Sequence, residues 1–151
     1  MRLLVLSDSH GRASHVLEAI ARQPTAEAIF FLGDGEEDCD CVSLATKAPL
    51  FSVKGNCDWG SSLPEERTVM LGDVTILAVH GHTLGVKYDF SKLWDKLAQC
   101  GAALTLFGHT HTPCVESRDG VTIFNPGSLR DGRYGFVDIT PAGIFCRPWH
   151  L

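Results

Sequence analysis

Short apolar runs that end abruptly in Asp, Asn or His recur along the chain, and they constrain its fold more than any other feature. RLLVLS (residues 2–7) leads into Asp8 and His10, and AEAIFFL (26–32) leads into Asp34. Such runs are typical of buried, parallel strands. In open α/β sheets, ligands bind beyond the carboxyl ends of the strands. The pattern therefore predicts an α/β fold with a polar site at one sheet edge.

Helical spacing separates these runs in the first half of the chain. Apolar residues recur every three to four positions in SHVLEAIARQ (14–23), and Pro24 follows as a stop signal. A second helix is predicted over about 37–46, before a third strand in APLFSVKGN (48–56). This order is a βαβαβ opening, which implies parallel strands joined by right-handed crossovers.

The second half predicts a hairpin, one helix and several short strands. RTVMLGDVTILAVHG (67–81) has the pattern of two strands joined by a Gly-Asp turn, and the apolar spacing within 84–100 predicts a helix that stops at Gly101. Strands separated by Gly, Asp and Pro turns follow at 103–108, 114–117, 121–127, 134–140 and 143–148. We expect one α/β domain over residues 1–151 with an antiparallel tail.

Composition excludes several classes of protein. No apolar run approaches the roughly 20 residues that span a bilayer, and the run Leu3 to Leu6 is too short for a secretory signal. We therefore expect a cytoplasmic protein whose six cysteines are free thiols. The net charge of −5 disfavours nucleic acid as a partner, because that partner requires a basic face.

The polar residues at the strand ends are of metal-ligand types. Each has an ordinary alternative: Asp8 suits a helix N-cap, Asp34 a turn, and a single His80 would more often be structural. Their joint occurrence after five separate strands favours one shared site. The candidate ligands are Asp8, His10, Asp34, Asn56, His80, His109 and His111.

This mixture of oxygen and nitrogen donors indicates which chemistry to expect. It suits Mn²⁺, Fe²⁺, Zn²⁺, Ni²⁺ or Co²⁺ better than Mg²⁺ or Ca²⁺. Seven side-chain ligands exceed the needs of one such ion but fit two ions that share a bridging carboxylate. Two dications with the carboxylates of Asp8 and Asp34 and a bridging hydroxide leave a positive site. Such a site predicts hydrolysis of a phosphoester through attack by the bridging hydroxide.

Six ordered motifs resemble those of the calcineurin-like metallophosphoesterase superfamily. They are similar above all to its small bacterial and archaeal phosphodiesterase branch, which is related to the retromer subunit Vps29. The motifs are DSH (8–10), GD (33–34), GNCD (55–58), HGH (80–82), GHTH (108–111) and NPGS (125–128). The resemblance implies a four-layer α/β/β/α sandwich and two divalent transition-metal ions, with manganese favoured and nickel, iron, zinc or cobalt as alternatives.

The resemblance also implies which residues hold each ion. One ion would be bound by Asp8, His10, Asp34 and His111, and the other by Asp34, Asn56, His80 and His109. Asp34 would bridge the two.

One motif departs from the wider superfamily, in which a histidine follows the asparagine. Here Cys57 stands at that position, as in the small-phosphodiesterase branch, and a thiol is a poorer proton donor than an imidazolium. His82 could instead face the phosphate, or it could be a supporting group. Both His82 and Cys57 are catalytic candidates, although Cys57 also suits a buried filler. Asp58 either orients a neighbour or caps a turn, and Ser128 is better read as structural.

The predicted function is metal-dependent hydrolysis of a small phosphoester, with a phosphodiester favoured over a phosphomonoester. The competing interpretation is a non-catalytic, Vps29-like scaffold, which could lose ligands freely; the complete ligand set favours the enzyme. Loops 57–66 and 82–90 would then determine specificity. The apolar residues of the first loop, Trp59, Leu63 and Pro64, would line a substrate pocket or form a contact in a homo-oligomer.

Overall fold

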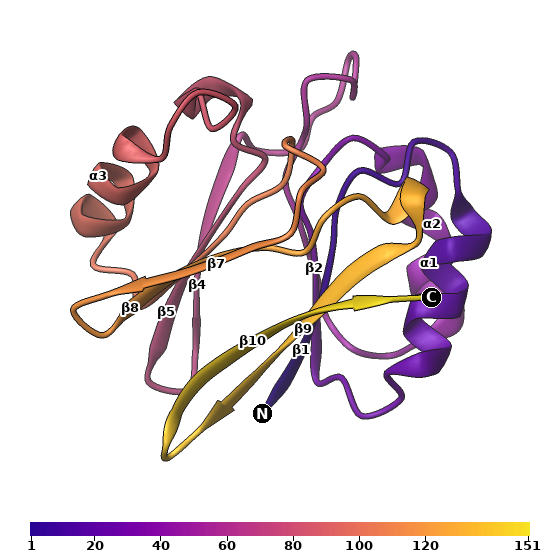
Figure 1. Cartoon of the computed structure of the whole chain (residues 1–151). Coiled ribbons are helices and arrows are strands. Elements are labelled where there is room, and N and C mark those ends of the chain that lie inside the picture. The colour runs from indigo at the N-terminus through magenta and orange to yellow at the C-terminus, as the bar shows by residue number, and fades with distance from the viewer.

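Two five-stranded sheets pack face to face in the computed structural model, which describes residues 1–151 (Figure 1). The first sheet has the order β10-β9-β1-β2-β3, in which β1, β2 and β3 are parallel and β9 and β10 are antiparallel to their neighbours. Its strands are β1 (Arg2–Leu6), β2 (Ala28–Phe31), β3 (Leu50–Ser52), β9 (Arg133–Thr140) and β10 (Gly143–His150).

The second sheet has the order β4-β5-β6-β8-β7. Its three central strands, β5, β6 and β8, are parallel, and the outer strands are antiparallel to them. The strands are β4 (Glu66–Leu71), β5 (Val74–Val79), β6 (Leu104–Leu106), β7 (Cys114–Arg118) and β8 (Val121–Asn125). Each sheet therefore has three parallel strands whose carboxyl ends supply loops to one edge.

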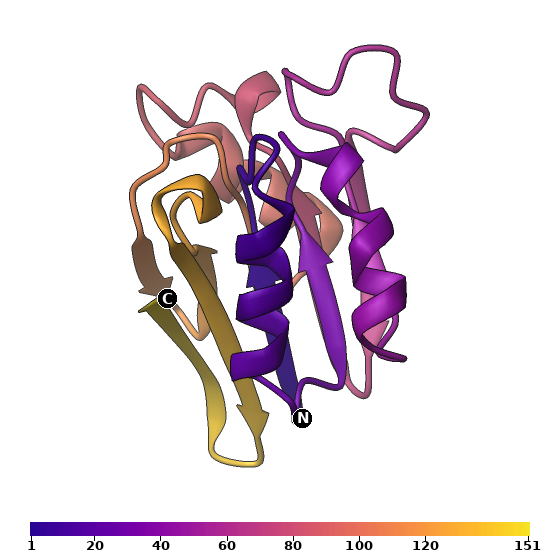
Figure 2. The ribbon, with the colours of Figure 1, turned by 90° about the vertical axis from the view of Figure 1, so that its right-hand side faces the viewer.

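Helices cover the outer face of each sheet. α1 (Ala13–Arg22) and α2 (Asp40–Ala45) lie on the first sheet, and α3 (Ser91–Cys100) lies on the second (Figures 1 and 2). The remaining elements are short 3₁₀ turns, η1 (Glu36–Asp38), η2 (His82–Leu84) and η3 (Leu129–Asp131). The predicted four-layer α/β/β/α sandwich is confirmed. None of its helices has both the length and the apolar character needed to cross a membrane.

Apolar side chains from both sheets share the central core. Leu3 and Phe30 of the first sheet and Leu106 and Phe124 of the second are fully buried in one cluster. Two further clusters fill the space between each sheet and its helices. Burial of each such side chain stabilises a fold by about 1.5–3 kcal/mol. The packed sheets therefore hold the ends of the edge loops in fixed positions.

Two predictions about the second half need correction. The helix predicted within 84–100 begins only at Ser91, because Gly85 is left-handed (φ 63°) and the Asp89 carboxylate accepts the Ser91 N–H at 2.8 Å. The C-terminal part is also not simply antiparallel, since β8 lies parallel to β6. The predicted hairpin of β4 and β5 is present, and all six cysteines are free.

Candidate metal centre

All seven predicted ligands lie on loops at the carboxyl ends of the parallel strands. Five of these residues have a left-handed backbone, with φ between 47° and 67°: Asp8, His10, Asp34, His109 and His111. This conformation is uncommon for residues other than glycine, and each instance costs on the order of 1–3 kcal/mol. The sharp turns direct these side chains back over the sheet edge, so hydrogen bonds elsewhere must offset the strain.

Buried polar side chains supply those hydrogen bonds. Asn125 donates to the carbonyl of Gly108 at 2.8 Å and to the hydroxyl of Thr110 at 3.1 Å, which holds the loop of the histidine pair. Ser128 is fully buried and donates to the carbonyl of Asp8. These contacts agree with the structural interpretation of NPGS and of Ser128.

The Asp58 carboxylate organises the loop that carries Asp34. Its two oxygens accept the backbone N–H groups of Asp34, Gly35, Glu36 and Gly55 at 2.7–3.0 Å. Burial opposes ionisation, but these four bonds lower the pKa of Asp58 below its usual value. The two interpretations of Asp58 therefore merge, because it caps a turn and thereby orients the Asp34 backbone.

Two glycines are required by close approach to the candidate ligands. A Cβ at Gly55 would lie 2.0 Å from the Asp34 Oδ1 atom, and one at Gly108 would lie 2.8 Å from the Asp8 Oδ2 atom. Neither has a positive φ. The space that a side chain would fill is occupied at Gly55 by the Asp34 carboxylate, and at Gly108 by the Ser7 hydroxyl at 2.0 Å together with the Asp8 carboxylate, which explains the glycines of GNCD and GHTH.

The first group of candidate ligands contains Asp8, His10 and His111, whose donor atoms all lie within 4.8 Å of one another. The Asp8 Oδ1 atom is 3.0 Å from His111 Nε2 and 3.9 Å from His10 Nε2. Asp8 is fully buried, whereas His10 and His111 are partly exposed. This group therefore opens to solvent on the side of the two histidines.

The second group surrounds the buried ring of His80. Its Nε2 atom lies 3.1 Å from Asn56 Oδ1, 3.1 Å from His109 Nδ1 and 3.4 Å from Asp34 Oδ2. The same Asp34 oxygen lies 4.0 Å from His10 Nε2 in the first group. Asp34 is thus the carboxylate that faces both groups.

Lone pairs converge in this arrangement. The His80 Nδ1 atom is 2.6 Å from the carbonyl of Leu32, which can only accept, so Nδ1 carries the hydrogen and Nε2 of a neutral ring presents a lone pair. That lone pair faces the acceptor oxygens of Asn56 and Asp34. In the first group, His10 Nε2 is buried without a hydrogen-bond partner, and the fully buried Asp8 Oδ1 faces only the imidazole nitrogens of His111 and His10. A cation would relieve both arrangements, so the donor set fits divalent metal ions.

The pKa values of the cluster follow the same electrostatics. Burial would raise the pKa of Asp34, but the hydrogen bond and positive charge of His80 hold it well below its usual range. Burial would lower the pKa of His80, but Asp34 and Asp8 raise it. Burial and the charge of His80 lower the pKa of His109 to about 4. The two carboxylates thus favour positive charge on the His80 ring, and that charge disfavours protonation of His109.

The two catalytic candidates lie beside this cluster. His82 is partly exposed, and its Nε2 atom lies 3.5 Å from the Glu65 carboxylate, which also pairs with Lys54 at 3.2 Å. Cys57 is exposed, so its interpretation as a buried filler is wrong. The Cys57 backbone N–H donates to Asp34 Oδ1 at 2.8 Å. Partial burial and the charge of Asp34 raise the pKa of its thiol, which therefore stays protonated at neutral pH.

Several residues at the site carry no local sequence signal. Asp38 is buried, accepts the Gly11 N–H at 3.1 Å and bonds the Ser9 hydroxyl, which holds the turn of DSH. Lys87, from the loop 82–90, acts electrostatically on both His109 and His111. Only a map of contacts between distant segments could have identified these residues.

The fold and the site together define a metal-binding α/β sandwich with a mixed N/O cluster at the shared edge of its sheets. Residues 1–139 match the calcineurin-like phosphoesterase superfamily domain. A probable metallophosphoesterase of Bacillus subtilis is 33% identical over 130 residues, covering 86% of this chain and 76% of the relative. The chain belongs to the calcineurin-like phosphoesterase superfamily, a family of metal-binding hydrolases.

Solved structures show the same fold. A novel archaeal phosphodiesterase superimposes with a TM-score of 0.81 at 20% identity, with full coverage of both chains. Vps29 of Entamoeba histolytica in complex with zinc has a TM-score of 0.78 at 20% identity, and the match covers 99% of each chain. The structural neighbours therefore include both an enzyme and vacuolar protein sorting proteins.

Proposed function

We propose that this protein is a dinuclear metal-dependent phosphodiesterase that hydrolyses a small phosphodiester. The position of Asp34 carries the proposal, because one oxygen faces His80 at 3.4 Å and His10 at 4.0 Å. One ion would be held by Asp8, His10, Asp34 and His111, and the other by Asp34, Asn56, His80 and His109, with Asp34 bridging. Carboxylate, amide and imidazole donors together favour Mn²⁺, with Ni²⁺, Fe²⁺, Zn²⁺ and Co²⁺ as alternatives.

Two such ions, when bound, supply positive charge for phosphate oxygens and lower the pKa of a water nucleophile. The protein's own residues orient the substrate. The Nε2–H of His82, which lies 3.5 Å from the Glu65 carboxylate, would transfer its hydrogen bond from Glu65 to a phosphate oxygen, and the ammonium of Lys87 would attract the anion. The protonated thiol of Cys57 is a weak donor beside the leaving group.

The open edge of the sheets supports a diester rather than a monoester substrate. Asn56 and Cys57 are exposed, and His10, His109 and His111 are partly exposed, so both ester groups have room. The fold shared with an archaeal phosphodiesterase supports the same preference. A scaffold would need neither an open site nor a complete donor set, and this observation favours the enzyme over a Vps29-like role.

A metal-reloading assay tests the function. The protein is stripped of metal, reloaded separately with Mn²⁺, Ni²⁺ or Zn²⁺, and assayed with p-nitrophenyl phosphate and bis(p-nitrophenyl) phosphate. We expect hydrolysis that depends on added metal and prefers the bis-ester. Faster hydrolysis of the monoester would reassign the protein as a phosphomonoesterase. No hydrolysis by fully loaded protein would favour the scaffold.

Alanine variants of the histidine pair should empty different metal positions. On the proposed assignment, His111→Ala removes a ligand of the ion held by Asp8 and His10, whereas His109→Ala removes one from the ion held by His80. We expect each purified variant to retain about one equivalent of metal where the parent retains about two. Metal analysis gives the stoichiometry, and the ring ¹⁵N chemical shifts of His10 and His80 in the diamagnetic Zn²⁺-loaded protein show which imidazole binds the remaining ion. Loss from the same position in both variants would contradict the division.

A further inference from the structure

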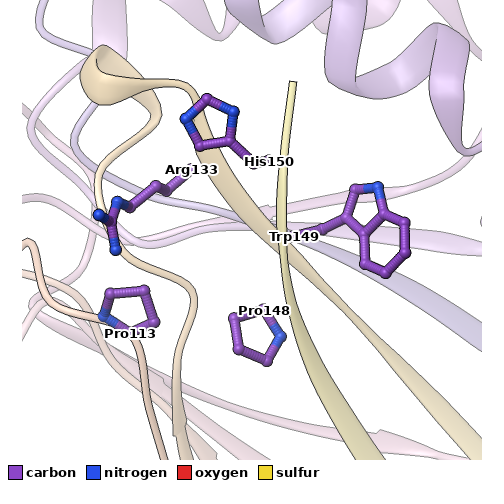
Figure 3. Close-up of a pocket in the computed structure, with 5 residues that line it drawn as sticks. All are labelled: Pro113, Arg133, Pro148, Trp149 and His150. Atoms are coloured by element: carbon purple, nitrogen blue, oxygen red, sulfur yellow. The ribbon is translucent and has the colours of Figure 1, made fainter.

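A groove of about 510 Å³ lies beside the metal centre and has no part in the proposed chemistry. Pro113, Arg133, Pro148, Trp149 and His150 line it. Figure 3 shows Arg133 and His150 on the same side of β10 as Pro113, while the indole of Trp149 extends to the other side. The groove thus combines a guanidinium and an imidazole with two proline rings.

The two basic side chains rest against glycine backbone. A Cβ at Gly127 would lie 2.9 Å from Arg133 Cβ and 3.0 Å from Pro113 Cγ, and one at Gly132 would lie 3.1 Å from the His150 ring. Arg133 forms no ion pair and no side-chain hydrogen bond. Its stem is therefore positioned by packing, while all the donors of its guanidinium remain available to a ligand.

The segment that carries Arg133 is bonded directly to the edge of the metal centre. The Arg133 N–H donates to the carbonyl of Ser128, whose hydroxyl donates to the carbonyl of Asp8. The N–H of Arg130 donates to the same Asp8 carbonyl at 3.0 Å. On the other wall, Pro113 is two residues from His111, so their Cα atoms are within about 7 Å. Both walls of the groove therefore continue directly into loops that carry candidate ligands.

We propose that the Arg133 groove binds a second phosphate group of a substrate whose scissile phosphodiester occupies the metal centre. The guanidinium matches the geometry of phosphate oxygens and forms charge-assisted hydrogen bonds with them. The guanidinium supplies the donors, because His150 Nδ1 already bonds the carbonyl of Leu151 at 2.9 Å, and the rings of Pro113 and Pro148 offer an apolar surface to the intervening sugar. This inference rests on the proposed function and adds the substrate class, a phosphodiester with a separate terminal phosphate.

Two esters that differ by one phosphate test the groove. They are thymidine 5′-(p-nitrophenyl phosphate) and the same compound with a 3′-phosphate. We expect the 3′-phosphate to lower KM about fivefold for the Mn²⁺-loaded parent, which corresponds to one solvent-exposed, charge-assisted bond. Arg133→Gln should abolish this preference and leave kcat and KM for the ester without the 3′-phosphate unchanged. Arg133→Lys should retain part of it.

Arg22→Gln is the matched control, because it removes one positive charge from the outer helix α1, where Arg22 pairs with Glu18. It should keep the parent's preference. Equal KM values for the two esters in the parent, or an unchanged preference in Arg133→Gln, would overturn the inference.

A binding measurement separates failure of the groove from failure of the proposed function. Inorganic phosphate is titrated into the metal-free, full-length protein, and the backbone amide signals of Arg133 and His150 are followed by NMR. Saturable shifts that disappear in Arg133→Gln support the groove even if neither ester is hydrolysed, in which case the proposed function fails alone. Absence of such shifts overturns the groove whatever the activity.

Discussion

Replacing Asp34 by alanine should lower metal-dependent phosphodiester hydrolysis by about a thousandfold, because several kcal/mol of charge stabilisation depend on two correctly placed ions. Asp34 is the carboxylate that faces both groups of candidate ligands, at 3.4 Å from His80 and 4.0 Å from His10. The variant should also retain at most one equivalent of metal. Steady-state rates with bis(p-nitrophenyl) phosphate and metal analysis of the purified protein measure the two effects.

Asp34→Asn makes this experiment sharper. The amide keeps an acceptor for the Cys57 N–H, which donates to Asp34 Oδ1 at 2.8 Å, but removes the charge that a bridging ligand needs. We expect the Asp34→Asn variant to lose nearly as much activity as the Asp34→Ala variant but to keep more of the parent's thermal stability. Asp95→Asn, on the exposed face of α3, should change neither property. An Asp34→Ala protein with two metals and the parent rate would refute the bridging role.

Asp58→Asn should destabilise the protein by about 3 kcal/mol or more, although Asp58 contacts no candidate ligand side chain. Its carboxylate accepts four backbone N–H groups at 2.7–3.0 Å. An asparagine side chain keeps one oxygen as an acceptor for two of the N–H groups, but it turns its NH₂ group towards the other two. Each of these two N–H groups loses a hydrogen bond to a charged acceptor, which contributes about 1.5–3 kcal/mol to stability. Urea denaturation measures the loss as a lower midpoint with an unchanged slope.

The same substitution should weaken metal binding, because the N–H groups of Asp34 and Gly55 share one Asp58 oxygen. Release of these groups allows the Asp34 loop to leave its left-handed turn (φ 59°). We expect a drop in metal affinity of about 10–100-fold, as is usual when a group that orients a ligand is removed. Asp95→Asn again serves as the control. Parent-like stability and affinity in Asp58→Asn would show that the carboxylate does not organise the loop.

The layers of the fold were predictable because hydrophobic periodicity is a local property. Runs such as RLLVLS and AEAIFFL identify buried strands wherever they occur, and they became the parallel neighbours β1 and β2. The start of α3 was not predictable in this way, since apolar spacing continued through 84–90. The left-handed Gly85 and the bond from the Ser91 N–H to Asp89 ended that pattern.

The sequence by itself determined which residues reach the shared sheet edge. Each candidate ligand lies in the loop that follows an apolar strand, and the local hydrophobic pattern is enough to identify that loop. Tertiary structure alone decided that one Asp34 oxygen faces two histidine groups, that Asp58 bonds a loop 22–24 residues away, and that Arg133 lies beside the metal centre. These relations join segments far apart along the chain. Their geometry depends on how the two sheets pack, and no spacing between neighbouring residues records it.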